Sequence, residues 1–97
     1  MNASNRKTVI RYRNFRFKYH IPLPDLAAVA GLSPQRLSQL ELTGVPSVRS
    51  QQILLHAMET VLTKRHAHAH EGLDAFEKEK AHLFELEQEL RGVSNEQ

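Results

Sequence analysis

The chain has 97 residues, 40% of them apolar, and this length and composition suit one small domain with a modest core. It contains no cysteine, which excludes a disulfide framework, a thiol nucleophile and a cysteine-based zinc site. The first residues carry no apolar signal region and no apolar run has membrane-spanning length, so we expect a cytoplasmic protein without a membrane contact.

The net charge is +2, but positive and negative residues are separated along the chain. Residues 1–70 hold ten Lys and Arg against three acids, which gives +7. Residues 71–97 hold three Lys and Arg against eight acids, which gives −5. This asymmetry predicts two parts, a polyanion-binding body at 1–70 and an acidic appendage at 71–97, unless both are ordinary solvated faces.

Residues 8–21 contain two competing periodicities. Phe15, Phe17 and Tyr19 alternate with charged or polar residues as in a strand, whereas Tyr12, Phe15 and Tyr19 share one face of a helix. The residues alone leave helix and strand open. In either structure the segment carries a dense basic cluster, which serves solubility or contacts phosphate groups without reading a sequence. The predicted phosphate contacts in this cluster are Arg11, Arg13, Arg16 and Lys18.

Two short helices are predicted next, at 24–30 and 33–42, after a break made by prolines. Gly31 begins a tight turn between them. Ser33 is a good N-cap for the second helix, and Pro34 stands at its first position, where the missing N–H costs nothing. Apolar residues line one side of each helix, and these are Leu26, Ala27, Val29, Ala30, Leu37 and Leu40.

Two short helices joined by a tight turn form the arrangement that sets the second helix into the major groove of DNA. The exposed face of the predicted helix 33–42 is polar. Glutamine can form a bidentate contact with adenine, and arginine with guanine. The predicted base-reading residues are Gln35, Arg36, Ser38 and Gln39.

A loop at 43–46 and a third helix at 48–64 follow, with Ser47 as the N-cap of that helix. Apolar residues at helical spacing along 48–64 predict that this helix completes the core. We expect further phosphate contacts from the loop and from the start of the helix. The residues concerned are Thr43, Gly44 and Arg49.

Histidine and alanine alternate over residues 66–70. In a helix His66 and His70 lie on one face, at a spacing that can bind a transition metal. No third ligand stands at a fixed offset, so we predict no metal site and favour a solvated or phosphate-facing histidine cluster. If that cluster faces DNA, protonation strengthens binding as the pH falls.

Residues 71–91 are rich in helix formers, and their apolar residues recur at steps of three, four or seven. This pattern predicts a C-terminal amphipathic helix. A single helix of this length is marginal in water, so its apolar stripe must pack on its own domain, on a protein partner or on a second copy. We favour a homodimer, with an interface formed by Leu73, Phe76, Leu83, Leu86 and Leu90.

Residues 9–64 resemble the phage-repressor family of helix-turn-helix proteins, also called the Cro-like or xenobiotic-response-element type. The family pattern is a Leu-Ala pair, a turn glycine, a Ser or Thr cap, a Gln-containing recognition helix and a Glu before a Gly. It is carried here by Leu26, Ala27, Gly31, Ser33, Gln35, Glu41 and Gly44. The resemblance implies a first helix at 8–21, which we adopt, and a structural role for Glu41. The chain departs from the pattern by one extra residue before Gly44, and by Pro34 in place of a base-reading side chain.

The sequence therefore predicts an all-α fold, a helix-turn-helix DNA-binding domain of four to five helices with a C-terminal amphipathic helix. The predicted function is sequence-specific binding of double-stranded DNA as a dimer, in repressor-like regulation of transcription. The alternatives are an accessory DNA-binding factor of a mobile element or plasmid, acting in excision or replication, and a protein-interaction module on the same fold. No catalytic constellation or phosphate-cradling glycine loop occurs, so we predict neither an enzyme nor a cofactor.

Overall fold

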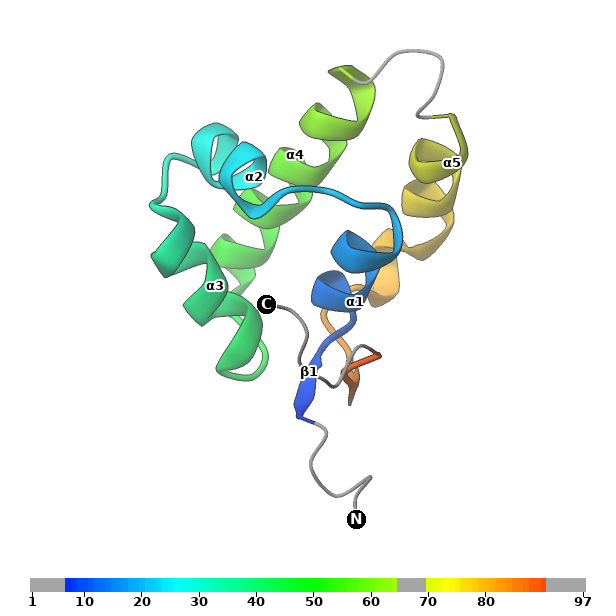
Figure 1. The fold of residues 1–97 in the computed structure, drawn as a ribbon. Coiled ribbons are helices and arrows are strands. Elements are labelled where there is room, and N and C mark those ends of the chain that lie inside the picture. The colour runs from blue at the N-terminus through cyan, green and yellow to red at the C-terminus, as the bar shows by residue number, and fades with distance from the viewer. Residues whose placement is uncertain (1–6, 65–69, 91–97) are drawn as a thin grey trace.

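The computed structural model describes residues 7–64 and 70–90, which are mostly helical with one small antiparallel sheet (Figure 1). The predicted helical fold is therefore confirmed at this level, with a sheet that the sequence did not predict. In chain order the elements are β1 (Thr8–Ile10), α1 (Arg11–Lys18), α2 (Leu23–Ala30), α3 (Pro34–Leu42), α4 (Val48–Lys64), α5 (His70–Glu79), a short 3-10 helix (Lys80–His82) and β2 (Leu86–Gln88).

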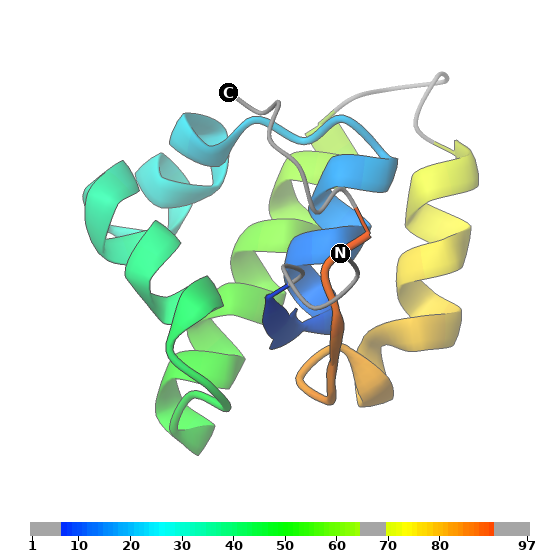
Figure 2. The same cartoon turned by 60° about the horizontal axis from the view of Figure 1, so that its bottom comes forward.

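Helix α4 lies at the centre of the molecule, with α2 and α3 on one side of it and α1 and α5 on the other (Figures 1 and 2). Its residues Leu54, Ala57 and Met58 are fully buried. Tyr12 of α1 is buried with them, and its hydroxyl donates a hydrogen bond of 2.7 Å to the carbonyl oxygen of Leu54. Burial raises the pKa of the Tyr12 hydroxyl well above its usual range. Apolar packing and one buried hydrogen bond thus hold α1 against α4.

The connection between α2 and α3 consists of three residues, Gly31, Leu32 and Ser33. Gly31 has a φ of +74°, a left-handed conformation that a glycine adopts without strain. The amide of Leu32 then donates to the carbonyl oxygen of Ala27 at 3.0 Å and closes the end of α2. The Ser33 hydroxyl accepts a bond of 3.0 Å from the amide of Arg36 and begins α3. The predicted turn and N-cap are confirmed.

Helix α4 begins in the same way as α3. The hydroxyl of Ser47 accepts a hydrogen bond of 3.1 Å from the amide of Ser50. The observed bounds of α4 equal the predicted ones, and α2 and α3 differ from prediction by one residue at one end. Signals that lie within a few residues of each helix end were sufficient to place these three helices.

Residues 8–21 divide between a strand and a helix, so the prediction of one helix there is wrong in its first part. Helix α1 begins at Arg11 without a side-chain cap. Instead, the amides of Arg11 and Tyr12 donate to the carbonyl oxygens of Glu85 and Leu83, at 2.8 and 2.7 Å. A distant part of the chain therefore satisfies amides that the start of a helix leaves unpaired.

The predicted helix at 71–91 is wrong beyond Glu79, where α5 ends. The chain turns back through the 3-10 helix, and β2 pairs with β1 so that Val9 lies opposite Glu87 and Ile10 opposite Leu86. In a helix, acids at alternate positions would point in different directions, whereas a strand places them on one side. The extended chain thereby directs the carboxylates of Glu85, Glu87 and Glu89 toward α1.

The described part of the acidic segment belongs to the same packed unit as the helices before it. Phe76 and Leu83 are fully buried in one core with α1, α2, α3 and α4. Residues 70–90 are therefore not an appendage to a body that ends at residue 70. Within residues 7–64 and 70–90, no helix combines the length and apolar character needed to cross a lipid bilayer.

Candidate nucleic-acid interface

Helix α3 has one buried side and one exposed side. Leu37 and Glu41 are fully buried and hold the helix against the rest of the molecule. Gln35, Arg36 and Gln39 are exposed, and Ser38 is half-buried. Three of the four predicted base-reading side chains therefore lie together on the open face of a helix that is fixed from behind.

Residues next to α3 extend this exposed polar face. Thr43 is exposed directly after the helix, and Gly44 is half-buried with a φ of +97° that favours glycine. Arg49 is exposed in the first turn of α4. Within the described part of the chain, Arg36 and Arg49 form no ion pair, so both cationic heads are free to contact an anion.

Glu41 anchors α3 to α1 through a buried ionic cluster. Its side chain is completely buried, and the side chain of Arg16 is 8% exposed. The guanidinium of Arg16 donates two bonds to this carboxylate, from Nε at 2.8 Å and from Nη2 at 2.9 Å. Arg13 donates a third from Nη1 at 2.9 Å. Two cations therefore neutralise and orient one buried carboxylate, as buried charges require.

A second set of acids lies on β2 and the residues next to it, and these acids contact arginines of α1. The Nε of Arg13 also donates to Glu89 at 2.6 Å, and the Nε of Arg11 donates to Glu87 at 2.9 Å. Glu85 lies 3.7 Å from Arg11 in a weaker ion pair. The hydrogen bond with Glu87 raises the pKa of Arg11 above its already high value. The acidic C-terminal segment therefore neutralises arginines of its own domain.

Asn14 holds this acidic segment at its outer edge. Its amide nitrogen donates to Glu87 at 2.6 Å and to the carbonyl oxygen of Gln88 at 3.0 Å, and its amide oxygen accepts from the amide of Leu90 at 2.8 Å. One side chain thus supplies the bonds that a further strand would make. Because an unpaired sheet edge invites pairing with other chains, this arrangement protects β2.

These contacts correct the expectation that the whole basic cluster of α1 is free for phosphate groups. Arg11, Arg13 and Arg16 are all bonded to acids of the same chain. The guanidinium carbons of Arg13 and Arg16 also lie 4.9 and 4.6 Å from the ring centre of Phe17. Lys18 remains exposed, with its ammonium 5.6 Å from the ring centre of Tyr19. Of the four predicted contacts in α1, Lys18 alone forms no ion pair with an acid of the described residues.

The predicted dimer interface is divided by the structure. Phe76 and Leu83 lie in the core of a single copy, where a second copy cannot reach them, and this corrects the expectation for both. Leu73 is half-buried against the same core. Leu86 and Leu90 are 48% and 60% exposed and face solvent beside the sheet. These last two leucines keep the predicted accessibility.

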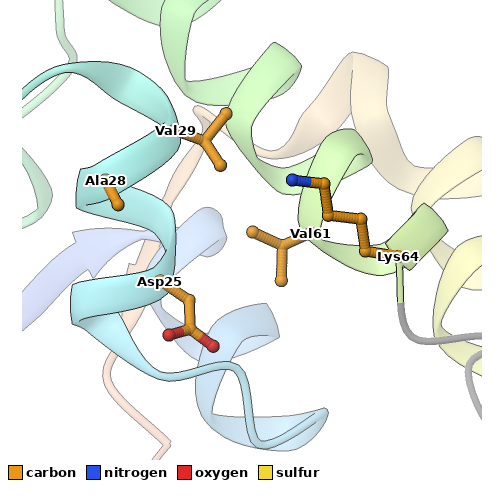
Figure 3. A pocket seen from close by; sticks show the side chains of 5 residues that line it. All are labelled: Asp25, Ala28, Val29, Val61 and Lys64. Atoms are coloured by element: carbon orange, nitrogen blue, oxygen red, sulfur yellow. The ribbon is translucent and has the colours of Figure 1, made fainter.

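Two concavities of the described surface lie along α2 and α4. One, of about 380 Å³, lies between α2 and α4, with Asp25 on α2, Lys64 on α4 and Val61 pointing into the space between the helices (Figure 3). Another, of about 410 Å³, lies along the same two helices and shares Val29 with the first. The described residues contain no cluster of His, Cys, Asp or Glu able to hold a metal ion, and the histidine run at 66–70 lies outside the described side chains.

Sequence reasoning missed Asn14, Glu85, Glu87 and Glu89 as partners of the basic cluster. A signal was present, because acids alternate with apolar or neutral residues from Glu85 to Leu90, which is the period of a strand. Comparisons of the chain with known protein families, with curated proteins and with solved structures gave no match. Its function therefore has to be argued from the arrangement of its own residues.

Proposed function

We propose that this protein binds double-stranded DNA in a sequence-specific manner and regulates transcription as a repressor-like protein. In this proposal α2, the Gly31 turn and α3 form a helix-turn-helix unit, and α3 lies in the major groove. The observation that carries the proposal is the form of this unit. A three-residue connection with a left-handed glycine leads into a capped helix whose outer face exposes Gln35, Arg36 and Gln39.

The exposed side chains suit the two tasks of a DNA-binding surface. Glutamine and arginine on the open face of α3 match the donor and acceptor pattern of base edges in the major groove. Thr43 directly follows α3 and Arg49 lies in the first turn of α4, and both are exposed for phosphate contacts that would fix the position of the helix on the duplex. Burial of Leu37 and Glu41 keeps the reading helix rigid, which lowers the entropy lost on binding.

Binding as a dimer remains part of this proposal, because two copies would place two reading helices on half-sites one helical turn apart. Of the residues predicted for the interface, Leu86 and Leu90 are accessible to a second copy. Sedimentation at several concentrations, with and without the selected duplex, measures the stoichiometry directly. A monomer on a single half-site would contradict the dimer and leave the reading role of α3 intact.

The proposed function is tested by selecting bound sites from random duplexes and measuring affinity for the selected site. Gln35→Ala and Gln39→Ala are each expected to cost ~1–3 kcal/mol of binding free energy on that site and to relax selectivity at one base pair. Gln52→Ala is the matched control, because Gln52 is an exposed glutamine on α4, outside the proposed reading helix. It should leave affinity and selectivity unchanged.

Two outcomes would contradict the proposal. Unchanged selectivity in the double variant of Gln35 and Gln39 would show that α3 does not read bases. Absence of binding to any duplex at low salt would instead favour a protein-interaction module, which the neutralisation of Arg11, Arg13 and Arg16 within the chain also suits. The genomic position of the selected site separates a promoter-bound regulator from an accessory factor at a recombination or replication site.

A further inference from the structure

The strand β2 and its flanks present three carboxylates at alternate positions, Glu85, Glu87 and Glu89, and all three contact arginines of α1. We name residues 85–90 the acidic strap. The contacts of Arg11 with Glu87 and of Arg13 with Glu89 are of the kind that a phosphate oxygen would make, a guanidinium N–H donating to an anionic oxygen. The acidic strap therefore occupies the arginines that the sequence marked out for phosphate.

We propose that the acidic strap competes with DNA phosphate for Arg11 and Arg13, and thereby limits the affinity of the chain for duplex DNA. The inference depends on the proposed function, because it concerns the same DNA-binding surface. It goes beyond that function by assigning a regulatory role to a segment outside the proposed helix-turn-helix unit. Displacement of the strap would release two cations that are masked in the free protein.

The position of Arg13 connects the strap to the proposed reading helix. Its guanidinium bonds Glu41 of α3 on one side and Glu89 of the strap on the other, at 2.9 and 2.6 Å. The carboxylate of Glu89 is therefore separated from α3 by the width of one guanidinium group. The negative charge of Glu89 therefore repels a phosphate group that approaches Arg13.

The arginines of α1 differ in how easily they can change partners. Arg11 and Arg13 are 35% and 14% exposed, so a phosphate can approach them from solvent. Arg16 is 8% exposed and forms two bonds with the fully buried Glu41, so it stays with the core whether or not the strap is present. The releasable pair is therefore Arg11 and Arg13.

The strap itself is held by a short sheet and by three hydrogen bonds of the Asn14 side chain. It joins β1 through three residue pairs, and a two-stranded sheet of this size is marginal in isolation. Leu86 and Leu90 add little burial because both are exposed. The fully buried Leu83 lies just before the strap and keeps α5 anchored. Residues 86–90 can thus separate from α1 while the carbonyl oxygens of Leu83 and Glu85 keep their bonds to the first amides of α1.

The test is the double variant Glu87→Gln and Glu89→Gln, which keeps side-chain shape and one acceptor oxygen at each position but removes two negative charges. Two released phosphate contacts should steepen the dependence of log Kd on log salt by about 1.8. Between about 50 and about 200 mM salt, the Kd of the variant should therefore rise roughly twelvefold more than that of the wild type. At the lower salt concentration the variant should bind the selected duplex more tightly.

The matched control is Asp74→Asn with Glu59→Gln, which changes the net charge equally at exposed sites of α5 and α4 that form no ion pair within the described residues. It should leave the salt slope unchanged. Adding Arg11→Gln and Arg13→Gln to the strap variant should abolish its gain in slope. Equal effects of the strap and control variants would overturn the inference, since net charge alone would then account for the change. A salt slope of the strap variant equal to that of the wild type would overturn the inference as well.

A measurement on the wild type keeps the inference testable if the strap variant does not fold. Amide hydrogen exchange of residues 86–89 should accelerate when the selected duplex is added, because phosphate displaces the strap. Unchanged or slower exchange would overturn the inference. Duplex binding that depends on Gln35 and Gln39 but is unaffected by the strap variant would leave the proposed function standing. If neither the wild type nor the strap variant bound any duplex, both the inference and the proposed function would be contradicted.

Discussion

Helices α1 and α3 both carry arginines, but within the described residues the arginines of α1 form ion pairs and the arginine of α3 does not. On α1 the guanidinium groups of Arg11, Arg13 and Arg16 are bonded to acids from α3 and from the acidic strap. On α3 the side chain of Arg36 is exposed and bonded to no acid in the described residues. The number of cations in a segment therefore does not give the number that can meet a ligand.

The same two helices also begin in different ways. A serine next to α3 caps its first turn, whereas the first amides of α1 bond to the carbonyl oxygens of Glu85 and Leu83. Helix α3 therefore carries its own start signal, while α1 depends on the C-terminal segment. The comparison indicates that the C-terminal segment is required for the stability of α1 and contributes little to the start of α3.

The sharpest way to break the link between the two helices is Glu41→Ala. The substitution leaves the buried guanidinium of Arg16 without its carboxylate, and removal of one partner of a buried pair typically costs ~3–5 kcal/mol of unfolding free energy. Urea denaturation measures this loss. Glu59→Ala, at an exposed site on α4, is the control and should change stability by less than about 0.5 kcal/mol. A loss of unfolding free energy for Glu41→Ala as small as that of the control would show that the ion pair between Arg16 and Glu41 does not stabilise the fold.

A second substitution tests whether the C-terminal segment shares the core. Leu83→Ala should cost ~2–5 kcal/mol of unfolding free energy, because Leu83 is fully buried among residues of the common core. Leu90→Ala, at a leucine that is 60% exposed, is the matched control and should cost far less. The comparison is made by urea denaturation of both variants. Equal small losses would mean that residues 70–90 do not stabilise the helices before them.

How much the sequence could predict depends on how far apart the interacting residues are. Gly31, Ser33 and Pro34 determine the α2–α3 connection through bonds to near neighbours, so this unit could be predicted. The ion pairs of the strap could not be predicted from local signals, because Glu87 and Glu89 find their partners on α1, far away in the sequence. The competing helical spacing of the leucines at 83, 86 and 90 concealed the strand period.

The same reasoning applies to the candidate site. Exposure of Gln35, Arg36 and Gln39 followed from the apolar spacing of their own helix, and the structure places all three on its open face. Availability of Arg11 and Arg13 depended on acids elsewhere in the chain, which no local pattern reports. The role of the exposed residues in reading bases stays a prediction, and the selection experiment above tests it.

The smallest expected effect concerns the start of α3. Ser33→Ala removes the hydroxyl that accepts the amide of Arg36, and loss of such a cap costs ~1 kcal/mol of unfolding free energy. Ser38→Ala makes the same chemical change in the interior of α3, where alanine favours a helix, so it should be neutral or slightly stabilising. Urea denaturation of the two variants, without DNA, gives the difference. Because α1 takes its first bonds from the C-terminal segment, Ser33→Ala should leave amide exchange in α1 unchanged under native conditions. Faster exchange throughout α1 would show that α1 and α3 open together. The different partners of their first amides would then not make the two helices independent in solution.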